Sequence, residues 1–144
     1  MRWFWIDRFT AFESGKFASA IKNISLSDEA LDDYMPGRPN HPYALIIEGM
    51  AQTAGLLVAE VNHFTDRVVL AKVGKAIFHR PVLNGDQLKF YATIESRRDD
   101  GAVITGTTHI SDQLQGEIEL TFAFLSEQFG NRPLFPNNDL LGML

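Results

Sequence analysis

The stretch "DDYMPGRPNHPYALIIEGMAQTAGLL", residues 32–57, decides the fold of this chain. Three prolines and a glycine crowd residues 36–42 and stiffen the backbone, because each proline fixes its own φ and restricts the residue before it. A nearly continuous apolar run follows, and it contains a single carboxylate, Glu48. A lone acid in the most hydrophobic segment of a chain indicates either a hydrogen-bonded pair or a site for chemistry.

The apolar run predicts one long helix over residues 42 to about 62. Asn40 offers a side-chain oxygen to cap the helix start, and Pro42 suits its first turn. Apolar residues occur on nearly every side of this helix, as is typical of a helix that is buried on most of its surface. The run is at the lower limit of spanning length and neither flank carries a basic cluster, so we expect a buried globular helix and no membrane span.

Segments rich in Thr, Val, Ile and Phe on both sides of the helix predict strands. Gly15 joins the first two, and turns are expected at 83–86, 99–101 and 113–116. The expected strands cover residues 8–14, 17–24, 67–78, 86–98, 101–111 and 116–125. From Glu127 onward the chain is rich in Pro and Asn and is expected to be irregular. The pattern predicts an α+β fold, with a curved antiparallel sheet around one central helix in a single domain, residues 1–144.

Composition narrows the classes of function. The net charge of −5 makes nucleic acid an unsuitable partner, because the phosphate backbone requires a basic surface. The chain has no cysteine, which excludes disulfides, zinc–cysteine sites and thiol nucleophiles. No pair of its four histidines has metal-ligand spacing, so we expect no metal and no cofactor. The N-terminus lacks the apolar run of a signal peptide, and we expect a cytoplasmic protein.

Glu48 and Gln52 lie one turn apart on the same stripe of the predicted helix, with Gly55 and Ala59 below them. This narrow, partly polar stripe of small residues is suited to form one wall of a slot. Burial beside apolar groups raises the pKa of a carboxylate, which favours acid–base chemistry. The alternative, which the residues leave open, is a partly solvated Glu–Gln pair without a catalytic role.

The start of the predicted helix offers a second polar element. Its free backbone N–H groups, near Tyr43 and Ala44, carry positive partial charge. Such donors are suited to hold the oxygen of a thioester or an enolate.

Two motifs carry a resemblance to a known family. "YMPGRPNHP", Glu48 and "GMAQTAG" resemble the core motif of FabA/FabZ-type 3-hydroxyacyl-ACP dehydratases, in which His-Phe-Pro-Gly and a second proline pair precede a helix carboxylate and a Gln four residues later. "KAIFHRPVLNGDQL", residues 75–88, resembles the family's "FRRPVxPGDxL" segment. The resemblance extends over roughly residues 10–126. It implies the hotdog fold, in which two subunits join their sheets and form two active sites at the dimer interface.

The resemblance also implies roles for single residues. In the family the motif His removes the α-proton, the partner subunit's helix carboxylate handles the β-hydroxyl, and a backbone N–H supports the thioester oxygen. Carried over, the carboxylate is Glu48, the N–H is that of Tyr43, and Gln52 orients Glu48. The implied partners are an acyl carrier protein or coenzyme A thioester and a second copy of the chain, in a homodimer or a higher oligomer, within fatty-acid or related lipid or polyketide biosynthesis.

The sequence departs from the family at two positions. Tyr34 occupies the position of the motif His, and Tyr43 stands where the family has Gly. A phenol has a pKa of about 10 against about 6.5 for imidazole, so we expect Tyr34 to act as a hydrogen-bond donor and not as a base. His41 lies seven residues from both Tyr34 and Glu48 and is a possible substitute base, although the family places a hydrophobic residue there.

Three classes of function therefore stay open. The leading one is an acyl-thioester hydro-lyase of the dehydratase type, which the preserved Glu48, Gln52, "MPG" and "HRPVLNGD" favour. The others are a hotdog thioesterase that uses Glu48 to activate water, and a non-catalytic subunit that binds acyl chains or pairs with a complete dehydratase. Tyr34 favours these two.

A basic patch on the predicted sheet would steer an acidic carrier protein. Its members would be Lys72, Lys75, Arg80, Arg97 and Arg98, and the alternative is a set of separate solvated charges.

Overall fold

One antiparallel sheet and one long helix dominate the computed structural model, which describes residues 3–28, 30–31, 37 and 40–125. The elements follow the chain as β1 (Arg8–Glu13), β2 (Phe17–Asn23), α2 (Tyr43–Val61), β3 (Arg67–Phe78), β4 (Gln87–Arg98), β5 (Gly101–Ile110) and β6 (Gln113–Leu125). The expected α+β class and the order of elements are confirmed. Tyr34 and the tail from Glu127 lie outside the described residues.

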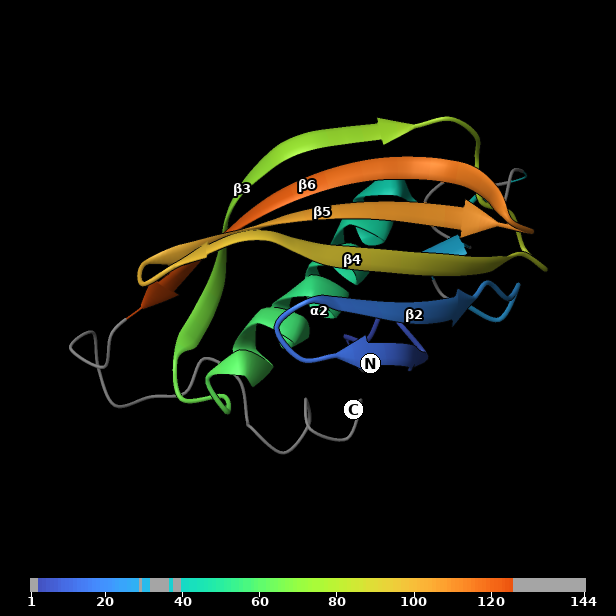
Figure 1. The fold of residues 1–144 in the computed structure, drawn as a ribbon. Helices are drawn as coiled ribbons and strands as arrows, with labels where there is room; N and C mark the ends of the chain where they lie inside the picture. Colours follow the sequence, from blue (N-terminus) through green and yellow to red (C-terminus); the bar gives the residue numbers. More distant parts are fainter. Residues whose placement is uncertain (1–2, 29, 32–36, 38–39, 126–144) are drawn as a thin grey trace.

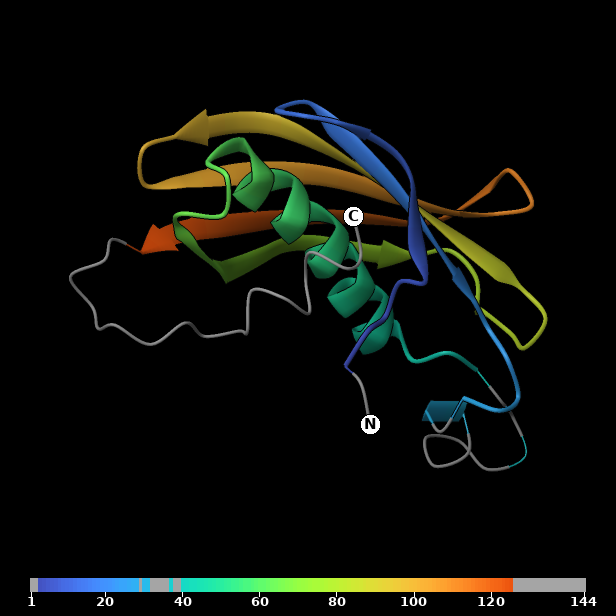
Figure 2. The ribbon, with the colours of Figure 1, turned by 90° about the horizontal axis from the view of Figure 1, so that it is seen from below.

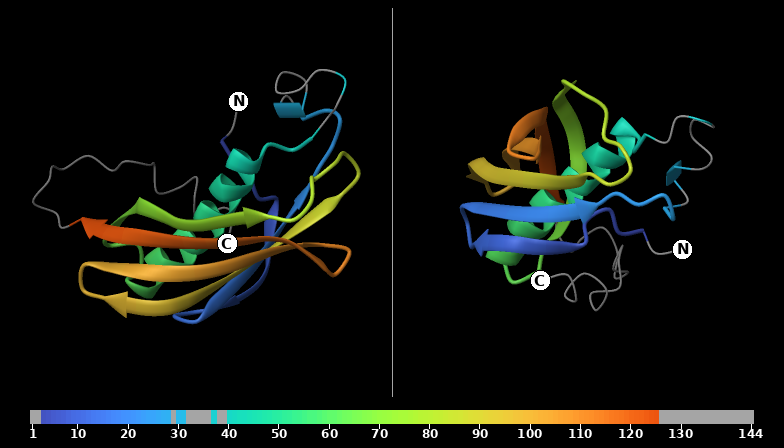
Figure 3. Two further views of the ribbon diagram at one scale, coloured as in Figure 1. Left: turned by 90° about the horizontal axis from the view of Figure 1, so that it is seen from above. Right: turned by 90° about the vertical axis from the view of Figure 1, so that its right-hand side faces the viewer.

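The six strands form one curved sheet in the order β1-β2-β4-β5-β6-β3, and every neighbouring pair is antiparallel. The sheet wraps α2, which lies along its concave face (Figures 1 and 2). The end-on view shows the same arrangement, with the helix enclosed on one side by the strands (Figure 3). This is the expected hotdog architecture.

Burial of α2 explains why its sequence is apolar nearly all round. Its fully buried side chains include Ile46, Met50 and Leu57, which pack into one core with residues of β2, β4, β5 and β6. Gly106 on β5 lets the helix approach closely, because a Cβ there would lie 2.5 Å from the Met50 sulfur. By length and composition alone α2 could cross a membrane, but here it packs in the sheet as a core helix.

Two local expectations are wrong. The turn between β5 and β6 is at Ser111 and Asp112, whose φ values of 48° and 61° suit a two-residue hairpin, and β6 already begins at Gln113. Gly116 is small for packing and not for a turn, because a Cβ there would meet the Thr108 hydroxyl at 2.7 Å. Asn40 does not cap α2 but bridges Leu83.

The two edges of the sheet differ in length and character. β1 has six residues, whereas β3 has twelve and carries three exposed large apolar side chains, Leu70, Val73 and Ile77. A long apolar edge presents unpaired backbone groups that favour pairing with another strand. The β3 edge is therefore the one suited to association.

Candidate active site

Glu48 and Gln52 form a hydrogen-bonded pair on α2. The Gln52 amide nitrogen donates to Oε1 of Glu48 at 3.3 Å, and both side chains are half-buried. The sequence pattern thus located the pair correctly. It did not locate the group that covers it, which comes from the N-terminus of the chain.

The Trp3–Trp5 segment runs beside α2 and contacts this pair (Figure 2). The Trp3 indole nitrogen donates to Oε1 of Glu48 at 3.2 Å. Gln52 donates to the Trp3 carbonyl oxygen at 2.9 Å and accepts from the Trp5 backbone N–H at 2.9 Å. The only hint in the sequence is the aromatic cluster at residues 3–5, because contacts over 45 or more positions leave no periodic signal.

The start of α2 carries no side-chain cap among the described residues, and Pro42 is its N-cap. The Pro42 carbonyl accepts from the N–H groups of Leu45 and Ile46, which leaves the first N–H groups directed out of the helix. The Tyr43 ring is 41% exposed and stacks on Phe78 at the end of β3, with ring centroids 4.3 Å apart. The stacked rings of Tyr43 and Phe78 therefore lie beside the uncapped N-terminal end of α2.

His41 is buried just before the helix. Its backbone N–H donates to Val82, and its ring centroid lies 6.0 Å from that of Trp5. Neither ring nitrogen has a hydrogen-bond partner among the described residues, and the side chain is 1% exposed. Burial, assisted by the charge of Lys22, lowers the pKa of His41 from 6.5 to about 4, so the ring is neutral at pH 7 and a weak base.

Of the two readings of the basic residues, the contacts of Arg80, Arg97 and Lys75 favour separate charges over one patch. Arg80 bonds to the carbonyl oxygen of Ile110 at the end of β5, whereas Arg97 pairs with Ala102 near the start of β5. These two arginines therefore lie at opposite ends of one strand. Lys75 is 3.5 Å from Glu117, which offsets its charge. The described basic residues do not present a single site for an acidic carrier protein.

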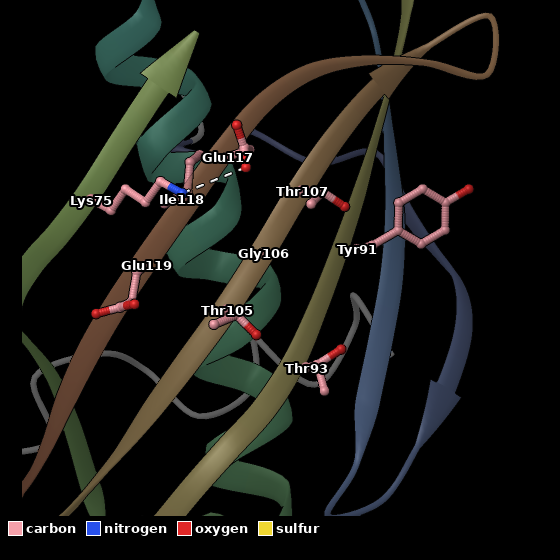
Figure 4. Close-up of a pocket in the computed structure, with 9 residues that line it drawn as sticks. All are labelled: Lys75, Tyr91, Thr93, Thr105, Gly106, Thr107, Glu117, Ile118 and Glu119. Carbon is pink, nitrogen blue, oxygen red and sulfur yellow. Dashed lines mark hydrogen bonds and ion pairs between the residues drawn. The ribbon is translucent and has the colours of Figure 1, made fainter.

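A cavity of about 290 Å³ opens on the face of the sheet opposite α2 (Figure 4). Its lining comprises Lys75, Tyr91, Thr93, Thr105, Gly106, Thr107, Glu117, Ile118 and Glu119. Helix α2, whose sequence includes Glu48 and Gln52, lies behind the strands that carry these lining residues (Figure 4). The cavity is therefore separate from the Glu48 site.

A sequence model of the FabA-like domain matches residues 3–118, which include the Trp3–Trp5 segment, Glu48 and Gln52. The chain belongs to the FabA-like family. The 3-hydroxyacyl-[acyl-carrier-protein] dehydratase FabZ of Symbiobacterium thermophilum is 36% identical over 121 residues, 83% of this chain and 85% of that protein. The FabZ of Nitratiruptor is 34% identical over 122 residues, 80% of this chain and 82% of that protein.

Solved structures show the same fold at low sequence identity. The dehydratase heterocomplex ApeI:P from Xenorhabdus doucetiae matches with a TM-score of 0.72 and 13% identity, over 87% of this chain and 85% of that chain. An acyl-CoA hydrolase from Staphylococcus aureus matches with a TM-score of 0.62 and 16% identity, over 78% of this chain and 65% of that chain. The hotdog fold is thereby confirmed.

Replacing His41 by Met tests the cost of its burial. In the native protein the pKa is about 4 and in the unfolded chain 6.5, so the unfolded chain binds more protons between these values. Stability due to the neutral ring is complete above pH 6.5 and is lost as the pH falls toward 4, by up to about 3 kcal/mol at about 1.4 kcal/mol per pKa unit. We expect the His41→Met variant to lack this loss of stability at low pH.

The measurement is the free energy of unfolding in urea at pH 7.5 and pH 4.5 for both proteins. Since other groups titrate equally in both, the difference between the proteins isolates His41. At pH 7.5 the variant should be at least as stable as the wild type, because it removes two buried ring nitrogens that have no partner within the described part of the chain. Parallel loss of stability in both proteins would contradict the assignment.

Proposed function

We propose that this chain is a hydro-lyase that dehydrates a 3-hydroxyacyl thioester carried by an acyl carrier protein or coenzyme A. The observation that carries the proposal is Glu48, held half-buried on α2 by Gln52, in a chain 36% identical to a FabZ dehydratase. Dehydration breaks the Cα–H and Cβ–O bonds, forms a Cα=Cβ double bond, and releases water. A carboxylate beside the substrate can both accept and return the proton.

Because a phenol at position 34 is a poor base near pH 7, we assign both proton steps to Glu48. Its carboxylate takes the α-proton and then, as a carboxylic acid, gives this proton to the departing hydroxyl group, so that water leaves and the carboxylate is restored. The Tyr43 N–H at the open start of α2 supports the thioester oxygen, on which negative charge develops. Tyr34 donates a hydrogen bond to the substrate. His41, buried with a pKa of about 4, takes no part in this scheme.

We further propose that two copies of the chain join their sheets through β3. β3 is an edge strand with Leu70, Val73 and Ile77 exposed, and its last residue, Phe78, stacks on Tyr43 at the start of α2. Pairing through β3 would therefore bring the partner subunit beside the Glu48 site, as expected for a shared site. We also propose the cytoplasmic location expected from the sequence, and α2, enclosed by the sheet, is not available to cross a membrane.

A second candidate is a subunit that pairs with a complete dehydratase. Tyr34 in place of the motif His favours it, as does the likeness in fold to the dehydratase heterocomplex of Xenorhabdus doucetiae. The purified protein alone, given 3-hydroxybutyryl and 3-hydroxydecanoyl thioesters of both carriers, distinguishes the two. Enoyl thioester formation by the chain alone supports the hydro-lyase, whereas activity only after a FabZ is added supports the subunit. Free thiol from saturated acyl thioesters would instead indicate a thioesterase.

Glu48→Gln is expected to abolish turnover. The amide keeps the shape of the side chain and cannot exchange a proton, so the rate of enoyl thioester formation should fall by at least about 100-fold. Thermal unfolding of the variant serves as the control, and its midpoint should stay close to that of the wild type. Full activity of Glu48→Gln on every thioester tested would make Glu48 a structural residue.

Substitutions of Tyr34 test whether its hydroxyl acts as a hydrogen-bond donor and not as a general base. Tyr34→Phe removes the hydroxyl alone and should lower kcat/KM about fivefold, the scale of one lost hydrogen bond. Tyr34→His introduces a base that titrates near neutrality and should raise the dehydration rate about tenfold or more. An unchanged kcat/KM in Tyr34→Phe would remove Tyr34 from the site.

A charged substitution on β3, the proposed dimer interface, tests the dimer. Val73→Glu places like charges on two copies of the same strand, which opposes pairing, and sedimentation velocity at micromolar concentration should show monomer. Leu114→Glu is the matched control, because Leu114 is similarly exposed but lies in the β5–β6 hairpin. A wild-type protein that sediments only as monomer would overturn both the dimer and the shared site.

A further inference from the structure

We infer that Trp3 is a positioning residue, which holds Oε1 of Glu48 through its indole N–H and so presents Oε2 to the substrate. The inference rests on the proposed function, because it concerns the same carboxylate. Its basis is the convergence of two donors on one oxygen: the Trp3 indole nitrogen at 3.2 Å and the Gln52 amide nitrogen at 3.3 Å. Within the described residues no hydrogen bond reaches Oε2.

Two donors on one oxygen fix the orientation of a carboxylate. A lone hydrogen bond leaves the group free to rotate about its terminal torsion, which is broad for Glu. With Oε1 occupied by donors from opposite sources, the helix and the N-terminal segment, Oε2 keeps its lone pairs for a substrate proton. The sequence predicted only the helix donor, Gln52.

The Trp3–Trp5 segment is itself fastened to the helix. The Gln52 side-chain amide uses its nitrogen on the Trp3 carbonyl and its oxygen on the Trp5 N–H, as a neighbouring peptide group would in a sheet. The Trp3 and Trp5 rings meet edge to face with centroids 5.1 Å apart. Asp7, two residues further on, donates its N–H to Ile21 of β2 at 2.7 Å. Trp3 is therefore held in place by both neighbouring elements.

The chemical character of the donor also fits. No ion pair to Glu48 is found in the described part of the chain, and the donors that hold it are neutral. A neutral donor orients a carboxylate without cancelling the charge that attracts a proton. Trp3 is 56% exposed, so its ring also borders the approach to Glu48.

Kinetics of two matched variants test the role in turnover. Trp3→Phe keeps an aromatic ring and deletes the N–H that Glu48 accepts, whereas Tyr91→Phe keeps an aromatic ring and deletes a hydroxyl in the cavity on the opposite face of the sheet. We expect kcat to fall about tenfold in Trp3→Phe with KM changed less than about twofold, the effect of one hydrogen bond to a charged group. Tyr91→Phe should change kcat less than about twofold. Equal kcat in wild type and Trp3→Phe would overturn the inference.

Fluorescence tests the contact independently of turnover, because Trp3 and Trp5 are the only two tryptophans. In Trp5→Phe the emission comes from Trp3 alone. Adding Glu48→Ala should make this emission more strongly quenched by iodide, since the ring loses its acceptor. Adding Glu60→Ala, which removes an acid of the same helix bonded by Ser14, should not. Equal quenching in the two double variants would overturn the contact.

The kinetic and fluorescence experiments distinguish a failure of the proposed function from a failure of the inference about Trp3. If the wild-type protein converts no thioester, the proposed hydro-lyase function is wrong. Iodide quenching then still shows whether Trp3 contacts Glu48. An active wild type with unchanged kcat in Trp3→Phe leaves the hydro-lyase intact and overturns the positioning role.

Discussion

Enclosure of α2 by a single sheet is the constraint on which the rest of the structure depends. One sheet can cover only one side of a helix, so the chain needs small residues where the two come closest and further groups for the side left open. Gly106 opposite Met50 serves the first need. The Trp3–Trp5 segment serves part of the second, on the stripe that carries Glu48 and Gln52. The candidate site thus lies where the sheet cannot reach the helix.

This position explains the mixed character of the site. A carboxylate deep in the core would require complete pairing, and one in open water would have no fixed orientation. Glu48 lies between these limits, half-buried and hydrogen-bonded on one oxygen. The uncapped start of α2, at Tyr43, precedes Glu48 by five residues on the same helix.

The sequence predicted the features that depend on local periodicity. The helix was expected at 42 to about 62 and runs from Tyr43 to Val61, and the strand expected at 67–78 matches β3. The helical period also predicted that Glu48 and Gln52 lie side by side, because residues four positions apart share a helix face. Features set by tertiary contact were missed or misassigned: Gly116 suggested a turn but is small for packing, and Asn40 suggested a cap but bridges Leu83. The Trp3 contact spans 45 positions and has no local signature.

The pairing of β3 with β6 is irregular at two points, between Leu70 and Lys72 and between Val73 and Lys75. Each irregularity adds one unpaired residue and so resets which side chains face the helix. Leu70, Val73 and Ala76 lie opposite the buried Phe122, Leu120 and Ile118, whereas Lys72 and Lys75 lie opposite Thr121 and Glu119.

Strict alternation from Leu70 would have turned Lys72 inward and Val73 outward. The first extra residue reverses the inward–outward alternation of β3, and the second restores it. Apolar side chains of β3 therefore stay opposite the buried side chains of β6, although the sequence of β3 does not alternate regularly. A single deletion in β3 outside these two extra positions would therefore turn the residues beyond it to the other face of the sheet, although every remaining residue would be the same.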